Sequence, residues 1–130
     1  MIGVFDSGVG GLSVLREIRR LLPGADLLYL ADQARAPYGE RSLQEVRDFS
    51  EAIARYLIGW GAAPVVIACN TASAAALRGL REQWPGVPFV GMEPAVKPAA
   101  HLTAMGKVGV LATQATFQGE LFADLVARYG

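Results

Sequence analysis

Short apolar runs alternate along this chain with longer segments whose apolar residues recur at helical spacing. The runs are rich in β-branched and aliphatic residues and are bounded by Gly, Pro or polar residues, which is typical of buried strands. We expect the residues from Leu27 to Leu30 to be buried on both faces of a sheet. The sequence predicts five strands: Ile2–Phe5, Asp26–Ala31, Pro64–Ile67, Pro88–Met92 and Lys107–Ala112.

Helix signals fill the segments between these runs. Ser42-Leu43-Gln44-Glu45 forms a capping box ahead of a stripe of apolar residues. Pro23-Gly24 and Pro85-Gly86 are typical of the ends of two other helices. We predict helices over Leu12–Leu22, from Ser42 to Gly59, from Cys69 to Trp84, from Pro94 or Lys97 to Ala104, and over Thr113–Tyr129.

Strands that alternate with helices of about ten to twenty residues indicate parallel βαβ units. The crossovers of such units are right-handed in nearly all cases. With 52% apolar residues, the chain can bury a core and differs in composition from a disordered one. The sequence therefore predicts an α/β fold, with a parallel sheet flanked by helices.

Four polar loops follow the predicted strands. The carboxyl ends of parallel strands share one edge of the sheet, and open α/β sheets bind their ligands there. We therefore expect a thiol, carboxylates, hydroxyls and an amide to meet at one rim. The loops are Asp6-Ser7-Gly8, Asp32 to Gly39, Cys69-Asn70-Thr71 and Glu93-Pro94.

Cys69 is the only cysteine in the chain and lies where the third strand ends and a helix begins. The free amides and the dipole of a helix N-terminus favour negative charge, so we expect the pKa of this thiol to be lowered toward the reactive thiolate. A lone cysteine is also commonly a small buried apolar side chain. Both interpretations stay open on position alone.

The glycines after the first strand indicate a tight turn. A P-loop would need a Gly-Lys pair, which is absent, and a dinucleotide fingerprint fails at Ser13, where its third glycine would stand. A phosphatase with an aspartyl nucleophile would carry a second acid at the position of Gly8. Two interpretations remain: amides that bind an anionic group such as a carboxylate, or a plain strand-to-helix turn.

Charge and residue usage limit the other kinds of partner. The 12 basic and 12 acidic side chains balance without a basic patch, which argues against nucleic acid. The apolar runs fall far short of the ~20 residues that cross a bilayer, so we expect a cytoplasmic protein with no membrane partner. One cysteine and the single histidine, His101, are too few for the usual zinc site, and His101 lies away from the predicted rim.

Five motifs, in this order, resemble those of the glutamate racemase family. They cover essentially the whole chain. Related aspartate racemases share the Cys-Asn-Thr element but look different at the first loop, so the resemblance favours glutamate. The motifs are Phe5–Val14, Ala31-Asp32 with Pro37-Tyr38-Gly39, Ala68–Ser73, Gly91–Ala95, and Val110–Thr113 with Thr116.

The resemblance implies a cofactor-independent isomerase that interconverts L- and D-glutamate and supplies D-glutamate for peptidoglycan. It implies neither pyridoxal phosphate nor a metal. Cys69 would be one of two acid/base thiols, with Asp6 assisting proton transfer, and Thr113 and Thr116 would line the far wall of the site. The substrate-binding residues would be Asp6, Ser7, Tyr38, Gly39, Asn70 and Thr71.

The chain departs from the family pattern in one respect. The family has a second cysteine, in a Cys-Thr-His element, and this chain has none. The resemblance implies two similar α/β domains with the site between them, so we expect residues 1–95 to form most of the first domain and residues 96–130 to begin the second. On this basis the chain is an N-terminal fragment that is not competent alone, and the full-length protein could be a homodimer.

Two other functions remain open from the sequence. The absent second thiol would fit a non-catalytic remnant that keeps an amino-acid-binding rim. A related single-thiol isomerase or decarboxylase of another small diacid would also fit one reactive cysteine.

Overall fold

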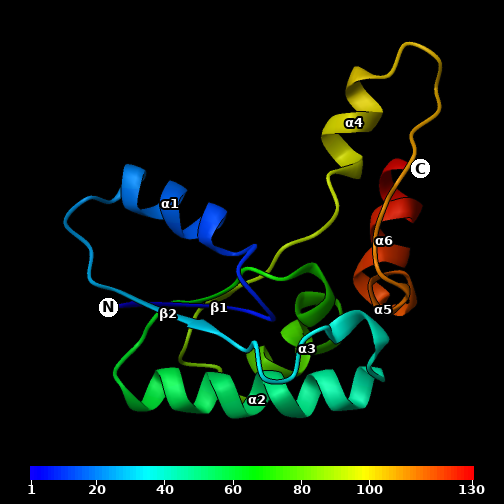
Figure 1. Cartoon of the computed structure of the whole chain (residues 1–130). Helices are drawn as coiled ribbons and strands as arrows, with labels where there is room; N and C mark the ends of the chain where they lie inside the picture. Colours follow the sequence, from blue (N-terminus) through cyan, green and yellow to red (C-terminus); the bar gives the residue numbers. More distant parts are fainter.

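A four-stranded parallel sheet forms the centre of the structure, a computed structural model that describes residues 1–130 (Figure 1). The strand order is β2-β1-β3-β4, with Gly3 of β1 opposite Leu28 on one side and Val65 on the other. This confirms the predicted α/β fold with a parallel sheet. The strands are β1 (Ile2–Asp6), β2 (Leu27–Ala31), β3 (Val65–Ile67) and β4 (Phe89–Val90).

Helices cover both faces of this sheet. Figure 1 shows α1 (Leu12–Leu21) on one face and both α2 (Leu43–Gly59) and α3 (Asn70–Gln83) on the other. The main core lies between the sheet and the α2–α3 pair, because alternate strand residues point to that side. Its fully buried side chains include Phe5, Val46, Leu57, Val65 and Ile67.

The helix boundaries agree with the local signals in the sequence. The Ser42 hydroxyl accepts a hydrogen bond from the Glu45 amide at 3.1 Å, and the Glu45 carboxylate accepts one from the Ser42 amide at 2.9 Å. The capping box is therefore confirmed. Helices α1 and α3 both end before the Pro-Gly pairs, where the chain cannot continue helical hydrogen bonding.

Two strands differ from their predictions. The residues of β2 are half-buried instead of buried on both faces, because β2 is an edge strand of the sheet. Strand β4 is limited to Phe89–Val90, and Val90 is 49% exposed. Periodicity identifies strands but does not say which of them lie at an edge.

The predicted strand over Lys107–Ala112 is wrong. These residues belong to no helix or strand, and no backbone–backbone hydrogen bond involves them. Their composition suits a strand, but a strand needs a neighbour to pair with. No other strand lies beside this segment in the structure, so it remains an extended connection.

The predicted helix over Thr113–Tyr129 is two helices, α5 (Gln114–Gln118) and α6 (Glu120–Tyr129). They meet at Gly119, whose ψ of 145° is extended instead of helical. A Cβ on Gly119 would lie 2.6 Å from the Ala74 Cβ, so the break lets the backbone approach α3 closely.

The helix predicted after Pro94 is α4 (Val96–Leu102), with Pro98 in its first turn, which agrees with the later of the two predicted starts. It is shorter than predicted because the chain becomes extended at Thr103. The predicted domain division near residue 95 stays a prediction. None of the helices combines the length and the apolar character that a membrane-spanning helix needs.

Candidate functional site

A pocket of about 770 Å³ opens at the carboxyl ends of β1, β3 and β4. Three of the four loops predicted to meet at a rim contribute to it, which places Asp6, Cys69 and Glu93 around one space. Residues of α4 and of the extended segment after it form the opposite wall. The polar residues of the lining are Asp6, Ser13, Cys69, Asn70, Thr71, Glu93, Thr113 and Thr116.

Cys69 lines this pocket and is the N-cap residue of α3. Its sulfur accepts a hydrogen bond from the Ala72 amide, with an Sγ–N distance of 3.4 Å. Its thiol donates to the Ser7 hydroxyl, with an Sγ–Oγ distance of 3.6 Å. The residue is 7% exposed, and its sulfur is among polar groups at the pocket wall. Cys69 also belongs to the buried core cluster, so both interpretations of this thiol stay open in the structure.

The predicted direction of the Cys69 pKa shift is wrong. Burial raises the pKa of the thiol, because it removes water that would stabilise the thiolate. Hydrogen bonds with the Ala72 amide and with Ser7 lower the pKa in part, and the nearby Asp6 raises it. Desolvation by burial is thus the largest influence on this thiol, and its pKa is raised overall.

Asp6 organises the glycine loop that follows β1. One carboxylate oxygen accepts a hydrogen bond from the Ser7 amide, and the other accepts one from the Gly11 amide. The N–O distance is 2.7 Å in each. Asp6 is 7% exposed, so the two hydrogen bonds compensate a buried charge. Two amides of the loop are therefore bound by Asp6 itself instead of remaining free for a ligand.

Three threonine hydroxyls form a cluster in the lining of the pocket. The Thr71 and Thr113 hydroxyls lie 2.8 Å apart, those of Thr113 and Thr116 lie 2.9 Å apart, and those of Thr71 and Thr116 lie 3.4 Å apart. Thr71 lies in the first turn of α3, Thr113 is the N-cap residue of α5, and Thr116 lies within α5. The cluster joins two helix N-termini at the pocket, and the exposed side of Asn70 lies beside it.

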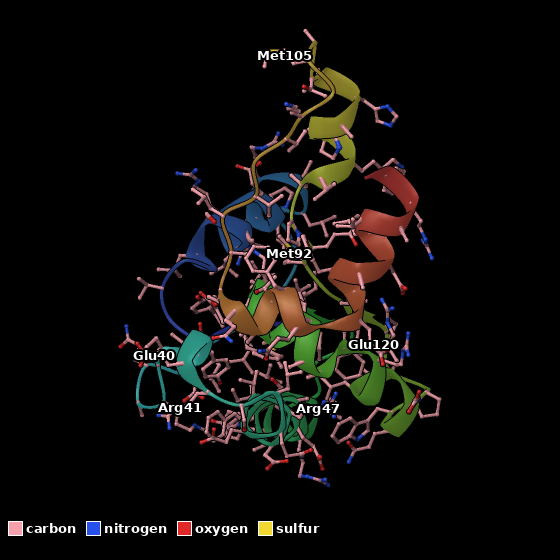
Figure 2. All side chains as sticks on the ribbon, turned by 90° about the vertical axis from the view of Figure 1, so that its right-hand side faces the viewer. Glu40, Arg41, Arg47, Met92, Met105 and Glu120 are labelled. Carbon is pink, nitrogen blue, oxygen red and sulfur yellow. The ribbon has the colours of Figure 1, made fainter.

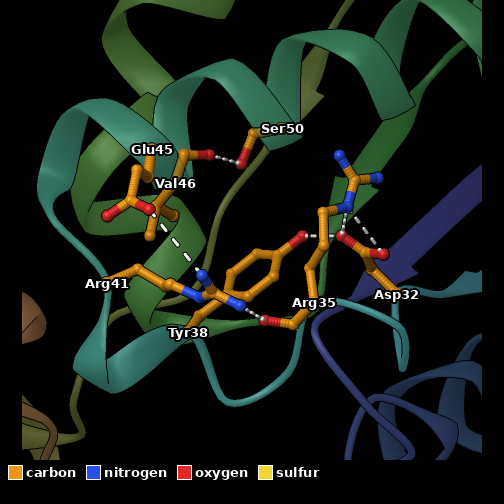
Figure 3. A network of polar contacts seen from close by, with 7 residues as sticks. All are labelled: Asp32, Arg35, Tyr38, Arg41, Glu45, Val46 and Ser50. Atoms are coloured by element: carbon orange, nitrogen blue, oxygen red, sulfur yellow. Dashed lines mark hydrogen bonds and ion pairs between the residues drawn. The ribbon is translucent and has the colours of Figure 1, made fainter.

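Tyr38 does not line the pocket. It is 2% exposed, and its hydroxyl donates to the Asp32 carboxylate at 2.5 Å (Figure 3). The Arg35 guanidinium binds the same carboxylate at 2.8 Å. Burial and this hydrogen bond raise the pKa of Tyr38 far above its usual value. The sequence placed Tyr38 in a polar loop at the rim of the site. In the structure the side chain is buried, because its hydroxyl can hydrogen-bond to Asp32.

Gly39 lies behind the threonine cluster. A Cβ on Gly39 would be 2.7 Å from the Thr113 Cγ2 atom, so the 3-10 turn η1 (Tyr38–Glu40) packs against Thr113. The structure thus brings Asp6, Ser7, Cys69, Asn70 and Thr71 together and leaves Tyr38 and Gly39 one layer away. A direct role of these seven residues in binding stays a prediction.

The sequence analysis missed the apolar part of the pocket. Val96 and Ala99 of α4 and Val110 of the extended segment line it. Figure 2 shows Met92 near the middle of the molecule and Met105 at its far end, beyond α4. A strand was predicted where Val110 lies, so its place in a pocket wall could not be anticipated. No three His, Cys, Asp or Glu side chains are grouped so as to hold a metal ion.

Comparisons with known proteins identify the family. Residues 2–130 match the model of the Asp/Glu/hydantoin racemase family. The chain belongs to this family. It is 62% identical over 128 residues to the glutamate racemase of Roseiflexus sp., and the match covers 98% of this chain and 47% of that protein. It is 58% identical to the glutamate racemase of Pseudomonas aeruginosa, over 98% of this chain and 48% of that protein.

Solved structures agree with this racemase-family assignment. The glutamate racemase of Aquifex pyrophilus is 42% identical with a TM-score of 0.88, and the match covers 99% of this chain and 51% of that one. The Escherichia coli glutamate racemase, solved with L-glutamate and the activator UDP-MurNAc-ala, is 44% identical with a TM-score of 0.85, over 98% of this chain and 49% of that one. The predicted family is confirmed. The chain spans about half the length of the curated relatives that it matches.

Proposed function

We propose that the protein containing this chain is a glutamate racemase and that the chain forms one wall of its active site. The observation that supports this most directly is Cys69, a buried thiol at the pocket between Ser7 and the N-terminus of α3. The similarity to glutamate racemases supports the choice of glutamate. In this proposal the enzyme acts in the cytoplasm and supplies D-glutamate for peptidoglycan synthesis.

The reaction transfers one proton off the α-carbon and another onto its opposite face. When Cys69 acts as the acid, its S–H bond breaks as the proton bonds to the planar α-carbon, and a thiolate remains. In the reverse direction the Cys69 thiolate takes the α-proton, and the electron pair stays on carbon until an acid on the other face supplies a proton. The raised pKa of the thiol suits its role as acid. Thiols alone can move these protons, so the proposal includes no cofactor.

The residues around Cys69 can bind the polar ends of glutamate. The Ser7 hydroxyl, the Asn70 amide and the Thr71 hydroxyl offer donors beside the sulfur, and fixed donors stabilise charge that develops on a carboxylate. In this proposal the buried Asp6 carboxylate raises the proton affinity of a neighbouring thiolate, which assists removal of the α-proton. The second acid/base lies on the other face of the substrate. Cys69 is the only cysteine of this chain, so a second thiol would have to come from outside these 130 residues.

Exchange of the α-proton in heavy water tests the proposal. The whole protein, as its source cell makes it, is incubated with L- or D-glutamate, and loss of the α-proton signal is followed by NMR. We expect both enantiomers to exchange, and we expect Cys69→Ser to slow exchange by roughly 100-fold or more. Tyr56→Phe, at an exposed position on α2, is the matched control and should leave the rate unchanged.

The possible outcomes distinguish between the three functions that the sequence left open. If neither enantiomer exchanges while glutamate still binds, the non-catalytic remnant is favoured. Exchange of another dicarboxylate in place of glutamate would favour the single-thiol isomerase. Full activity of Cys69→Ser would show that the acid/base group is wrongly assigned.

A further inference from the structure

Tyr29 lies on the face of the sheet opposite the main core. It pairs with Val4 in the register of β1 and β2, and its neighbours Leu28 and Leu30 pack against the core on the α2–α3 side. Because strand side chains alternate, Tyr29 points to the α1 side, where the glycine loop lies. Its hydroxyl donates to the Gly8 carbonyl at 3.0 Å, across 21 positions of sequence.

Tyr29 also lies close to the other end of the glycine loop. A Cβ added to Gly11 would lie 2.9 Å from the Tyr29 hydroxyl oxygen, 2.8 Å from the Asp6 Cβ and 3.0 Å from the Ala68 Cβ. Gly11 is therefore enclosed by Tyr29, by Asp6 and by the residue that precedes Cys69. The tyrosine hydroxyl binds the Gly8 carbonyl and lies where a side chain on Gly11 would have to go, so it is close to both ends of the turn.

The same loop carries the group that contacts the Cys69 sulfur. Asp6 binds the amides of Ser7 and Gly11, and the Ser7 hydroxyl lies 3.6 Å from the sulfur. A displacement of the loop would therefore move Ser7 relative to Cys69. Phenylalanine would fill the same space as Tyr29 but would leave the Gly8 carbonyl without this donor.

We propose that Tyr29 is a positioning residue for Cys69, whose hydroxyl fixes the Gly8–Gly11 turn and so keeps Ser7 against the sulfur. The inference rests on the proposed function and assigns to it a residue outside the pocket lining. Burial and the nearby Asp6 and Cys69 raise the pKa of Tyr29, so its hydroxyl keeps its proton and can act as a donor near neutral pH.

The test follows alkylation of Cys69 by iodoacetamide as a function of pH in the whole protein. Mass spectrometry of the peptide that contains Cys69 gives the rate for this thiol alone, and the midpoint of the pH profile reports its pKa. We expect Tyr29→Phe to move the midpoint upward by about 0.5 to 1 pH unit, because the thiolate loses the hydrogen bond of Ser7. Tyr56→Phe should leave the midpoint unchanged.

A double-mutant cycle separates positioning from a general loss of packing. If Tyr29 acts through Ser7, then Ser7→Ala alone should give a similar upward shift, and adding Tyr29→Phe should give no further one. Gly11→Ala, whose added methyl group would push the same turn away from Tyr29, Asp6 and Ala68, should shift the midpoint in the same direction. An unchanged midpoint in Tyr29→Phe, or shifts that add in full, would overturn the inference.

This experiment is independent of the substrate. A failure of glutamate to exchange its α-proton would refute the proposed function and leave the alkylation profiles as they are. Conversely, normal exchange together with an unshifted midpoint in Tyr29→Phe would refute only the role of Tyr29.

Discussion

The Asp32–Tyr38 pair shows how one side chain decides where its neighbour is placed. Asp32 is 6% exposed and accepts hydrogen bonds from the Tyr38 hydroxyl and from Arg35. The Arg35 guanidinium also lies over the Phe49 ring, 4.6 Å from its centre. These contacts fix the loop around Tyr38. The following residue, Gly39, packs against Thr113 of the pocket.

We expect Tyr38→Phe to lower the free energy of unfolding by about 1 to 2 kcal/mol near neutral pH, because a buried carboxylate loses one of its donors. Urea denaturation of the 130-residue chain measures this change. Tyr56→Phe, where the tyrosine is 54% exposed, is the control and should stay within about 0.5 kcal/mol. Equal effects of the two substitutions would contradict the importance of the buried pair.

The stability contributed by Tyr38 should depend on pH at the alkaline end. Its pKa is raised in the folded protein, so the unfolded chain loses this proton first, near its ordinary value of about 10. The contribution is therefore complete below about pH 10 and is lost as the pH rises toward the folded-state pKa. We expect the unfolding free energy of the parent to fall more steeply above about pH 10 than that of Tyr38→Phe. Parallel curves would contradict this assignment.

At the scale of the elements, Gly119 controls the junction of α5 and α6. A side chain there would meet the Ala74 Cβ at 2.6 Å and the Ala74 carbonyl oxygen at 3.1 Å, and backbone atoms cannot move aside as a flexible side chain can. The close approach of this junction to α3 places Thr113 and Thr116 beside Thr71. Helical spacing in the sequence gave no indication of this break.

We expect Gly119→Ala to lower the free energy of unfolding by about 1 to 3 kcal/mol, because the added methyl group overpacks the junction. Gly79→Ala is the matched control, since Gly79 lies within α3 with nothing within 4 Å of an added Cβ. That substitution should stabilise the protein by about 0.5 to 1 kcal/mol. Thermal or urea unfolding of both variants tests the pair, and stabilisation by Gly119→Ala would refute the packing argument.

At the scale of the whole molecule, protection of the backbone should be uneven. The amides of residues 106–112 donate no backbone hydrogen bond, whereas those of β1 and β3 belong to the central ladder. Hydrogen exchange followed by mass spectrometry should show rapid exchange over 106–112 and slow exchange over Val65–Ile67. Strong protection of 106–112 in the 130-residue chain would mean that this segment finds a pairing partner in solution.

The same region exposes apolar side chains and should cause self-association of the 130-residue chain. Leu102 is 84% exposed, Met105 is 81% exposed and Leu111 is fully exposed. Sedimentation velocity should show association that increases with concentration, because apolar surface is removed from water when copies meet. Replacing Leu102 and Leu111 by Gln should reduce it. A monodisperse monomer that melts cooperatively would contradict the expectation.

The sequence by itself determined the class of fold, the capping box of α2 and the family to which the chain belongs. Periodicity, Pro-Gly pairs and the Ser42–Glu45 capping box act within a few residues, so they can be interpreted from the chain alone. The rule that parallel strands share one carboxyl edge was sufficient to bring Asp6, Ser7 and Cys69 together.

Tertiary structure decided the features that depend on distant partners. Lys107–Ala112 has the composition of a strand but no strand beside it, and Gly119 breaks a helix because α3 lies close to it. Burial raises the pKa of Cys69 instead of lowering it as expected. The hydrogen bond to Asp32 allows the Tyr38 hydroxyl to be buried. Desolvation, pairing and close packing depend on which residues meet in space, and local sequence patterns do not contain that information.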